Sequence, residues 1–385
     1  MIDKPKTCIE DLFKNPSNGQ YLKVVAPMVR YSRLEFRSLV RRYDADLTFS
    51  PMTIANSFCR SERCRQHEFT TNIEDTPMIV QFAANCSTDF LHATEMIVRY
   101  ADGVDLNCGC PQSWAMQDGY GSYLLRKPEI IEDMIKTVRR NIPSSFSVSI
   151  KIRLLNKDLS STIDFCRKLE TLNPTFITIH GRTPNEKSSA EFPVDIDALA
   201  EIKKSIKLPI IFNGDVSSIT EADKFYNATK CDGMMSARAV LANPALFAGH
   251  QQTPLSCVQD WINIHNRQGD KMTFQNFHHH LVFMMENLLT KLERNKFNEF
   301  TKKHQCLEFL AEKFSITPQP IDYPNNFSCT YDDTNYKNLV NQKDFWTSNY
   351  STESSHGKFF LNKLNKVRQD PDVDYLEFMD NKLFS

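Results

Sequence analysis

The sequence lacks any apolar run near the length of about 18 residues that a membrane-spanning helix needs, and none of its cysteines stands in a Cys-x-x-Cys pair. The first absence excludes a transmembrane segment. The odd number of 11 cysteines disfavours a disulfide framework and structural zinc, so we expect reduced thiols. The first residues mix acids with lysines, unlike a secretory signal or a mitochondrial transit peptide. We therefore expect a protein of the cytosol or nucleus, without membrane contact.

A surplus of charge of one sign is also absent, because 46 Lys and Arg residues face 47 Asp and Glu residues. The overall charge therefore gives no indication of a nucleic-acid partner. Locally, eight arginines between residues 30 and 65 oppose four acids, and residues 357–368 (GKFFLNKLNKVR) contain no acid. A solvated helix face is the ordinary interpretation of either cluster alone.

A Gly-x-Gly-x-x-Gly motif is missing after the first apolar run, which disfavours an open, doubly wound Rossmann sheet. Instead, eight short apolar runs alternate with segments whose apolar residues stand three and four positions apart. The runs are residues 21–28, 45–52, 77–83, 103–108, 146–154, 176–182, 209–215 and 231–238, and helical patterns include residues 32–43, 88–100, 128–140 and 218–228. Eight such units in roughly 230 residues predict an α/β fold, the (β/α)8 TIM barrel.

A second region follows, because the alternation stops after Gly249. Residues 274–314 carry a helical stripe of apolar residues, and residues 316–333 form a loop rich in proline and asparagine. We assign residues 1–19 to an N-terminal lead-in, 20–250 to the barrel and 251–385 to a C-terminal helical domain. The adjacent His278, His279 and His280 point different ways around a helix, so they predict no metal site.

Most of the apolar runs end in polar side chains, and in a TIM barrel these carboxyl ends line the active site. The residues there are Met28, Met52, Gln81, Asn107 to Cys110, Lys151, Arg153, His180, Arg182, Asn213 to Asp215, Ala237 and Arg238. One polar end means little, because loops are polar. So many together favour a convergent enzyme site.

The last two loops offer a phosphate site, since Gly214 permits close backbone approach and Arg238 supplies a positive charge. An ordinary turn and a surface arginine are the alternatives. Gln81, Lys151 and His180 add an amide, a cation and an imidazole that suit a flat heteroaromatic ring. A satisfied core histidine or a lysine packed by its stem would explain each residue singly, but the set favours FMN.

Two thiols, Cys108 and Cys110, flank Gly109 directly before Pro111. A disulfide across one residue would be strained, and no second cysteine pair completes a tetrahedral zinc site. The stretch therefore favours one rigidly held thiol over a disulfide or half of a metal site.

Seven stretches now stand in a characteristic order: VAPMVRYSRLEFR (25–37), VQFAAN (80–85), DLNCGCPQ (105–112), VSIKIRL (148–154), ITIHGRT (177–183), IIFNGDV (210–216) and SARAVLANPALF (236–247). Together they resemble the tRNA-dihydrouridine synthases, FMN enzymes that reduce uridine to dihydrouridine in transfer RNA. The LNCGCP form and the long C-terminal extension are most similar to the eukaryotic branch that acts on D-loop uridines 20a and 20b.

The resemblance implies a role for each matching residue. Cys110 would be the catalytic proton donor, Asn107 and Arg182 would bind the substrate base, and NADPH or NADH would be the reductant. FMN would be held by Pro27, Met28, Val29, Gln81, Lys151, His180, Asn213, Gly214, Asp215, Ala237 and Arg238. Ala237 replaces part of a G-R-G-like turn in the family, and a φ below zero would accommodate it.

The resemblance also implies that the C-terminal helical domain grips transfer RNA, with no obligate protein partner. Phosphate contacts would come from the arginines of residues 30–65, from Lys291, Arg294, Lys302 and Lys303, and from residues 357–368. A small-molecule FMN oxidoreductase of the dihydroorotate or dihydropyrimidine dehydrogenase type is the alternative, but it would not use the helical domain. A barrel without catalysis is disfavoured by the joint presence of Cys110, Lys151, His180 and Arg182.

Overall fold

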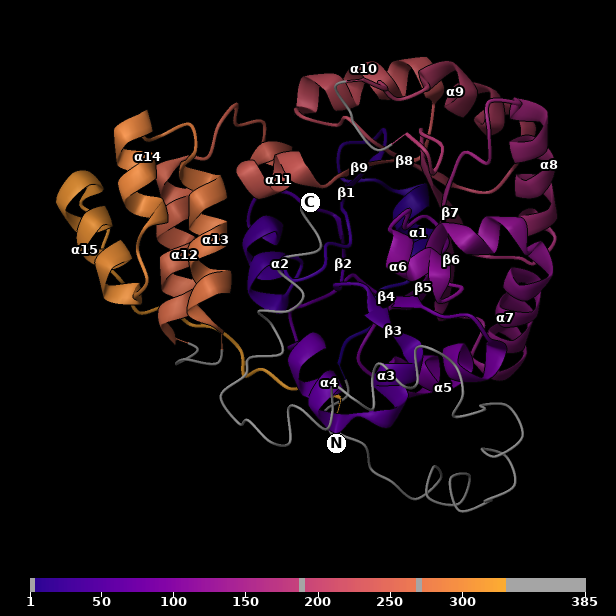
Figure 1. Ribbon diagram of the computed structural model, residues 1–385, viewed down its shortest axis with the longest axis horizontal. Helices are drawn as coiled ribbons and strands as arrows, with labels where there is room; N and C mark the ends of the chain where they lie inside the picture. The colour runs from indigo at the N-terminus through magenta and orange to yellow at the C-terminus, as the bar shows by residue number, and fades with distance from the viewer. Residues whose placement is uncertain (1–3, 187–190, 268–271, 330–385) are drawn as a thin grey trace. The chain divides into compact units, whose positions relative to one another are not determined.

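Eight parallel strands close into a barrel in the computed structural model, which describes residues 4–186, 191–267 and 272–329 (Figure 1). The ring consists of β1 (Leu22–Val25), β2 (Leu47–Phe49), β4 (Met78–Ala83), β5 (Gly103–Asn107), β6 (Ser147–Arg153), β7 (Phe176–His180), β8 (Ile210–Asn213) and β9 (Gly233–Ser236). Each strand pairs in parallel with the next, and β9 returns to β1, with Met235 opposite Val24. The predicted TIM barrel is confirmed.

The predicted second strand, residues 45–52, is shorter in the structure. After β2 ends at Phe49, the two-residue strand β3 (Thr53–Ile54) pairs with the far end of β4, where Thr53 lies opposite Phe82. Pro51 lies between the two strands and has no backbone N–H to donate to a ladder. The strand therefore ends at Phe49, ahead of Pro51, where the expectation extended it to Met52.

Helices surround the strands (Figure 1). They are α2 (Leu34–Arg41), α3 (Ala55–Arg60), α4 (Glu62–Glu68), α5 (Ser87–Ile97), α6 (Ser113–Gln117), η1 (Gly121–Arg126), α7 (Pro128–Asn141), α8 (Leu159–Glu170), α9 (Ile196–Ser205), α10 (Ile219–Thr229), α11 (Arg238–Ala242) and η2 (Leu246–Ala248). Local signals set several starts: Pro128 is the first residue of α7, and the Ser218 hydroxyl accepts the Glu221 N–H ahead of α10. The four predicted helical patterns correspond to α2, α5, α7 and α10.

The amino end of the barrel is covered by the short helix α1 (Ile9–Lys14). Its Ile9 belongs to a buried cluster with Phe49, Phe176 and Met235. Its Phe13 ring lies 5.4 Å from the ring of Phe176, the first residue of β7. The opposite end, where the strands finish, is left for the polar residues.

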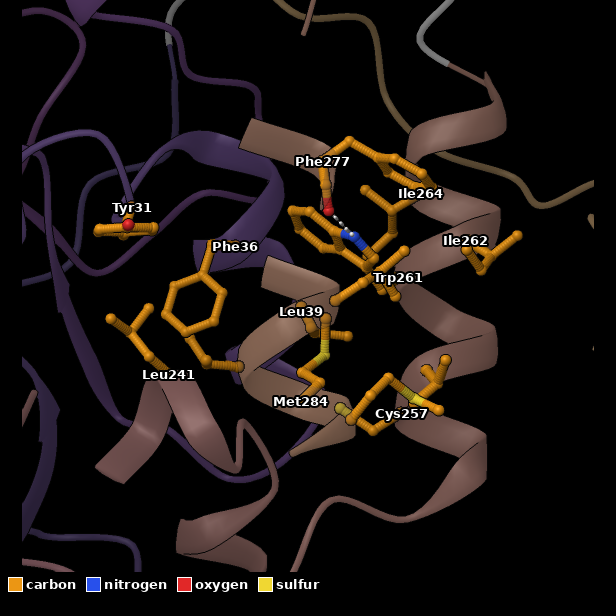
Figure 2. Packing of buried hydrophobic residues seen from close by; sticks show 14 of the residues in the cluster. Tyr31, Phe36, Leu39, Leu241, Cys257, Trp261, Ile262, Ile264, Phe277 and Met284 are labelled. Atoms are coloured by element: carbon orange, nitrogen blue, oxygen red, sulfur yellow. Dashed lines mark hydrogen bonds between the residues drawn. The ribbon is translucent and has the colours of Figure 1, made fainter. Parts of the chain in front are cut away.

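Four more helices follow the barrel: α12 (Leu255–Arg267), α13 (Phe274–Met285), α14 (Lys291–Asn298) and α15 (Lys303–Phe314). They share a buried core with α2, in which Trp261, Phe36 and Phe277 are fully buried (Figure 2). The Trp261 indole donates to the Phe277 carbonyl at 3.4 Å, and the His280 ring stacks on Phe36 at 4.7 Å between centroids. The helical C-terminal region is thus confirmed, and the three histidines, of which His278 and His280 are buried, belong largely to this core.

A strap of residues 315–329 runs from α15 back to the barrel. The Tyr323 hydroxyl lies 2.7 Å from Ser38 Oγ of α2, and Phe327 forms a bridge with Thr71. The Cys329 thiol donates to the Met96 carbonyl of α5 at 3.1 Å. The segment was predicted as a loop, and in the structure it ties the helical region to three parts of the barrel. Residues 330–385, including the basic stretch 357–368, lie outside the described residues, so the assignment of 251–385 to one domain stays a prediction. No helix in the described ranges has both the length and the apolar character needed to cross a membrane.

Candidate active site

The predicted site residues on β4 to β8 meet at the carboxyl end of the barrel because neighbouring strands hold them in register. Gln81 lies opposite Asp105, Asn107 opposite Lys151, and His180 opposite both Arg153 and Asn213. Pro27, Met28 and Val29 follow β1 at the same end and are half-buried. The Met28 N–H is fixed by the Ser32 hydroxyl at 2.9 Å.

Lys151 is the cation that β6 places opposite Asn107. Its ammonium donates to Asn213 Oδ1 at 2.7 Å, and Asn213 Nδ2 donates to the Met235 carbonyl at 3.2 Å. Burial, reinforced by the positive charge of Arg153, lowers the pKa of Lys151 to about 8. The ammonium therefore remains mostly protonated at neutral pH, yet it is poorly solvated and has few partners that offset its charge.

His180 is held neutral by its surroundings. Burial lowers the pKa of His180 far below its ordinary value, and the charges of Lys151, Arg153, Arg182 and Arg238 act in the same direction. Arg182 Nη1 lies 3.0 Å from His180 Nε2. A guanidinium can only donate, so Nε2 accepts and the ring proton resides on Nδ1. Arg182 also forms an ion pair with Asp215, which fixes it on its other side.

Gly214 occupies a position that only glycine can fill. Its φ is 122°, and a Cβ there would come 2.4 Å from Val194 Cγ1 and 3.0 Å from His180 Cδ2. Asp215 follows with a φ of 52°. The turn therefore brings bare backbone against His180, as the sequence predicted for a close-approach loop. Ala237 has a φ of −122°, the negative value that accommodates its side chain, and Arg238 begins α11 directly after it.

A chain of side-chain amides leads to the cysteine turn. Gln81 Oε1 accepts from Asn107 Nδ2 at 2.9 Å, and Asn107 Oδ1 accepts the backbone N–H groups of Gly109 at 3.1 Å and Cys110 at 3.0 Å. The carbonyl of Cys110 accepts from the N–H and the hydroxyl of Ser122 at 2.9 and 3.0 Å. Both sides of the Cys110 peptide are therefore fixed.

The two thiols differ in their surroundings. Cys108 is fully buried, and its N–H continues the ladder to the Lys151 carbonyl at 2.7 Å. Cys110 is partly exposed, and burial raises the pKa of its thiol against the opposing effect of the Gln112 N–H. Cys110 is consequently protonated at neutral pH. Among the described residues, no three His, Cys, Asp or Glu side chains gather as a metal site would require.

Asp105 was missed in the sequence analysis, and Arg153 was given no role there. Asp105 is fully buried on β5 and accepts from Ser149 Oγ at 2.6 Å and Gln81 Nε2 at 2.8 Å. Arg153 Nε donates to the Gly109 carbonyl at 2.9 Å and so holds the cysteine turn. The position of Asp105 inside the apolar run GVDLN was a visible signal, because an unpaired carboxylate is rarely buried.

The arginines of residues 30–65 do not form one basic surface. Arg37 and Arg65 are 1% and 7% exposed, and Arg41 pairs with the buried Asp75, so these three cannot contact a phosphate. Arg37 bonds Asp75 at 2.6 Å, and Arg65 donates to the Phe58 and Cys59 carbonyls. The expectation of phosphate contacts was wrong for them, because α2 directs Arg37 and Arg41 toward Asp75 and Arg65 of α4 is turned toward the carbonyls of α3. Lys291 and Lys302 are exposed on the C-terminal helices.

A family model and several known proteins that match this chain agree on one family. The family model described as "Dihydrouridine synthase (Dus)" matches residues 24–314. The chain is 46% identical over 315 residues to a mouse protein named tRNA-dihydrouridine(20a/20b) synthase [NAD(P)+]-like, covering 80% of this chain and 95% of that one. A human protein of the same name is 45% identical, with 78% and 93% covered, and a fission-yeast tRNA-dihydrouridine(20a/20b) synthase [NAD(P)+] is 40% identical, with 76% and 88% covered.

Proposed function

The chain belongs to the dihydrouridine synthase family, and on that premise we propose that it reduces the C5–C6 double bond of uridines 20a and 20b in the D-loop of transfer RNA. The proposed cofactor is FMN, with NADPH or NADH as the reductant. The observation that carries the proposal is the partly exposed thiol of Cys110 on a turn fixed by Asn107 and Ser122, within the influence of the Lys151 charge. That pair suits the reduction of a polarised double bond.

The residues present fit FMN by their chemistry. Gly214 leaves bare backbone where any Cβ would clash, and Arg238 offers a cation nearby for a phosphate. Lys151 and Gln81 offer N–H donors, with Asn213 holding Lys151 in place. Pro27, Met28, Val29, His180, Asp215 and Ala237 complete the proposed binding set. A bound, reduced FMN supplies a hydride.

Cys110 supplies the proton in this proposal. Hydride addition at one carbon of the uracil leaves negative charge shared between the other carbon and the carbonyl oxygens, and the thiol proton then passes to C5. The raised pKa of Cys110 keeps that proton on sulfur until it is needed. Lys151 and Arg182 provide positive charge that stabilises the intermediate anion, and Asn107 and Arg182 are the proposed contacts of the base.

The C-terminal helices are proposed to bind the transfer RNA. A stacked base must turn out of the folded RNA to reach the barrel, at a cost of a few kcal/mol that phosphate contacts can offset. Lys291, Arg294, Lys302 and Lys303 are the proposed contacts on α14 and α15, together with residues 357–368. The proposed division remains a lead-in at 1–19, a barrel at 20–250 and an RNA-binding region at 251–385.

The test is an assay of the purified protein with NADPH and unmodified transfer RNA, read by mapping dihydrouridine at positions 20a and 20b. We expect flavin absorption bands in the preparation and product only with transfer RNA. Free uracil and orotate are the matched substrates for the small-molecule alternative. Faster turnover of either free base, or a colourless protein that FMN does not reconstitute, would contradict the proposal.

A further inference from the structure

Asp105 is buried where the reaction has no direct use for a carboxylate. It lies inside the barrel on β5, is 0% exposed, and its two oxygens are taken by Ser149 and Gln81. Burial raises the pKa of Asp105 to about 6 despite those bonds and the charge of Lys151. At neutral pH it is therefore mainly an anion, although ionisation in this place is unfavourable.

In the series of hydrogen bonds from Asp105 to Cys110, each donor belongs to the residue on the Cys110 side. A carboxylate only accepts, so Gln81 must turn its Nε2 toward Asp105 and its Oε1 toward Asn107. Asn107 must then turn its Nδ2 toward Gln81 and its Oδ1 toward the N–H groups of Gly109 and Cys110. Backbone N–H groups only donate, so both ends of the chain demand the same direction.

We propose that Asp105 is a positioning residue for Cys110, acting through a relay of Gln81 and Asn107 whose two amides can satisfy both ends in one orientation only. A side-chain amide alone is free to rotate by half a turn, because its two ends are nearly equal in shape. With the carboxylate at one end and the cysteine turn at the other, a rotated amide would set oxygen against oxygen or N–H against N–H. This inference depends on the proposed function only for the role of Cys110 as the proton donor.

The relay makes a testable demand on Asp105 and Asn107, whose side chains both bond Gln81. Asn107→Asp puts an acceptor at both ends of Gln81, which has one donor end, so one bond must be lost or a carboxyl must take up a proton. Adding Asp105→Asn resolves the conflict: the new amide donates to Gln81 Oε1, Gln81 Nε2 donates to the new carboxylate, and that carboxylate still accepts the Cys110 N–H. Both changes preserve side-chain size.

The test is a cycle of Asp105→Asn, Asn107→Asp and the double variant, measured by thermal unfolding of the purified protein at neutral pH. We expect Asn107→Asp to lower the melting temperature most and the double variant to recover more than half of that loss. Additive losses in the double variant would overturn the relay. Direct repulsion between the carboxylates of residues 105 and 107 in the Asn107→Asp variant would also be relieved by Asp105→Asn. The cycle is therefore repeated in a Gln81→Leu background, which has no relay. There the recovery of melting temperature should fall to less than half of its former size.

A kinetic measurement then separates positioning from simple structural support. Asp105→Leu removes the acceptor, and we expect uridine reduction to slow by about 100-fold while reduction of the flavin by NADPH changes by less than about 3-fold. Asp105→Asn keeps an acceptor and should stay within about 10-fold of the parent. Ser149→Ala, which removes the other bond of the same carboxylate, is the matched control and should stay within about 3-fold. Equal losses in Asp105→Leu and Ser149→Ala would overturn the inference, whereas an inactive parent protein would count against the proposed function and leave the unfolding cycle valid.

Discussion

Two buried groups of cations in this molecule are built in different ways. In the Asp75 cluster, Lys4, Arg37 and Arg41 surround Asp75, and their donors also reach backbone carbonyls such as those of Ser32, Thr70 and Tyr100. Burial opposes ionisation of Asp75, but Arg37 and its neighbours hold the pKa of Asp75 below its usual range. At the barrel mouth, Lys151, Arg153 and Arg182 lie together, and within the described part of the chain only Arg182 of these three forms an ion pair, with Asp215.

The difference lies in how far each cluster balances its charges within the protein. Lys151 has a bond to Asn213 and a lowered pKa, so the free energy of its charge is unfavourable in the absence of an anion. Asp75 has its cations and its acceptors arranged around it within the protein. A buried cation that has no ion-pair partner in the described structure, as Lys151 has none, is suited to an anionic partner or a developing negative charge.

The largest expected contrast between the two clusters, in their effects on activity and on stability, comes from removing the Cys110 thiol at the carboxyl end of the barrel. Cys110→Ala should lower uridine reduction by about 10²- to 10⁴-fold, because a positioned proton donor is lost, while the melting temperature changes little. Single-turnover mapping of dihydrouridine and thermal unfolding together measure both effects. Cys108→Ala is the control, and it should lower stability while keeping most of the activity. Equal loss of product in the two variants would point to a shared structural role.

Breaking the Asp75 cluster should give the reverse result. Asp75→Ala leaves three buried cations without their acid and should lower the free energy of unfolding by about 3–5 kcal/mol, with activity per folded molecule retained. Urea unfolding measures the loss. Asp11→Ala, which removes an exposed ion pair with Lys14, is the control and should leave the free energy of unfolding nearly unchanged. A loss at Asp75 as small as at Asp11 would refute the structural assignment of the cluster.

The smallest expected effect is a dependence of stability on pH that comes from Lys151. Its pKa is about 8 in the folded chain and 10.5 in its ordinary state, so the unfolded chain binds more protons between those values. The unfavourable contribution is therefore complete below pH 8 and is relieved as the pH rises toward 10.5. Lys151→Met should lack this rise in the free energy of unfolding. The comparison is made on protein freed of bound cofactor, because an anion beside Lys151 would raise its pKa.

Much of the site could be predicted because strand ends in a barrel converge. Gln81, Lys151, His180 and Gly214 were found from their positions after apolar runs, without knowledge of any contact. Pro51 marks in the sequence the point before which β2 must end, but the expectation followed the apolar run past it to Met52. Local pattern therefore located the elements better than it located their ends.

Pairing across the chain could not be predicted. Nothing near Arg37 in the sequence shows that Asp75 lies 2.6 Å away, so its charge was assigned to the surface. Asp105 stood in a strand whose pattern was otherwise apolar, but its partners come from β4 and β6. Side chains whose role depends on residues distant in sequence need the fold before they can be interpreted.

The strap has a consequence for the order in which the chain folds during synthesis. Its contacts join residues that are 285 positions apart at Ser38 and Tyr323 and 233 apart at Met96 and Cys329. A ribosome releases the barrel long before it releases the strap, so the strands can pair while α2 and α5 still lack these partners. We therefore expect a chain truncated before residue 315 to form its barrel strands while leaving the surfaces around Ser38 and Met96 uncovered.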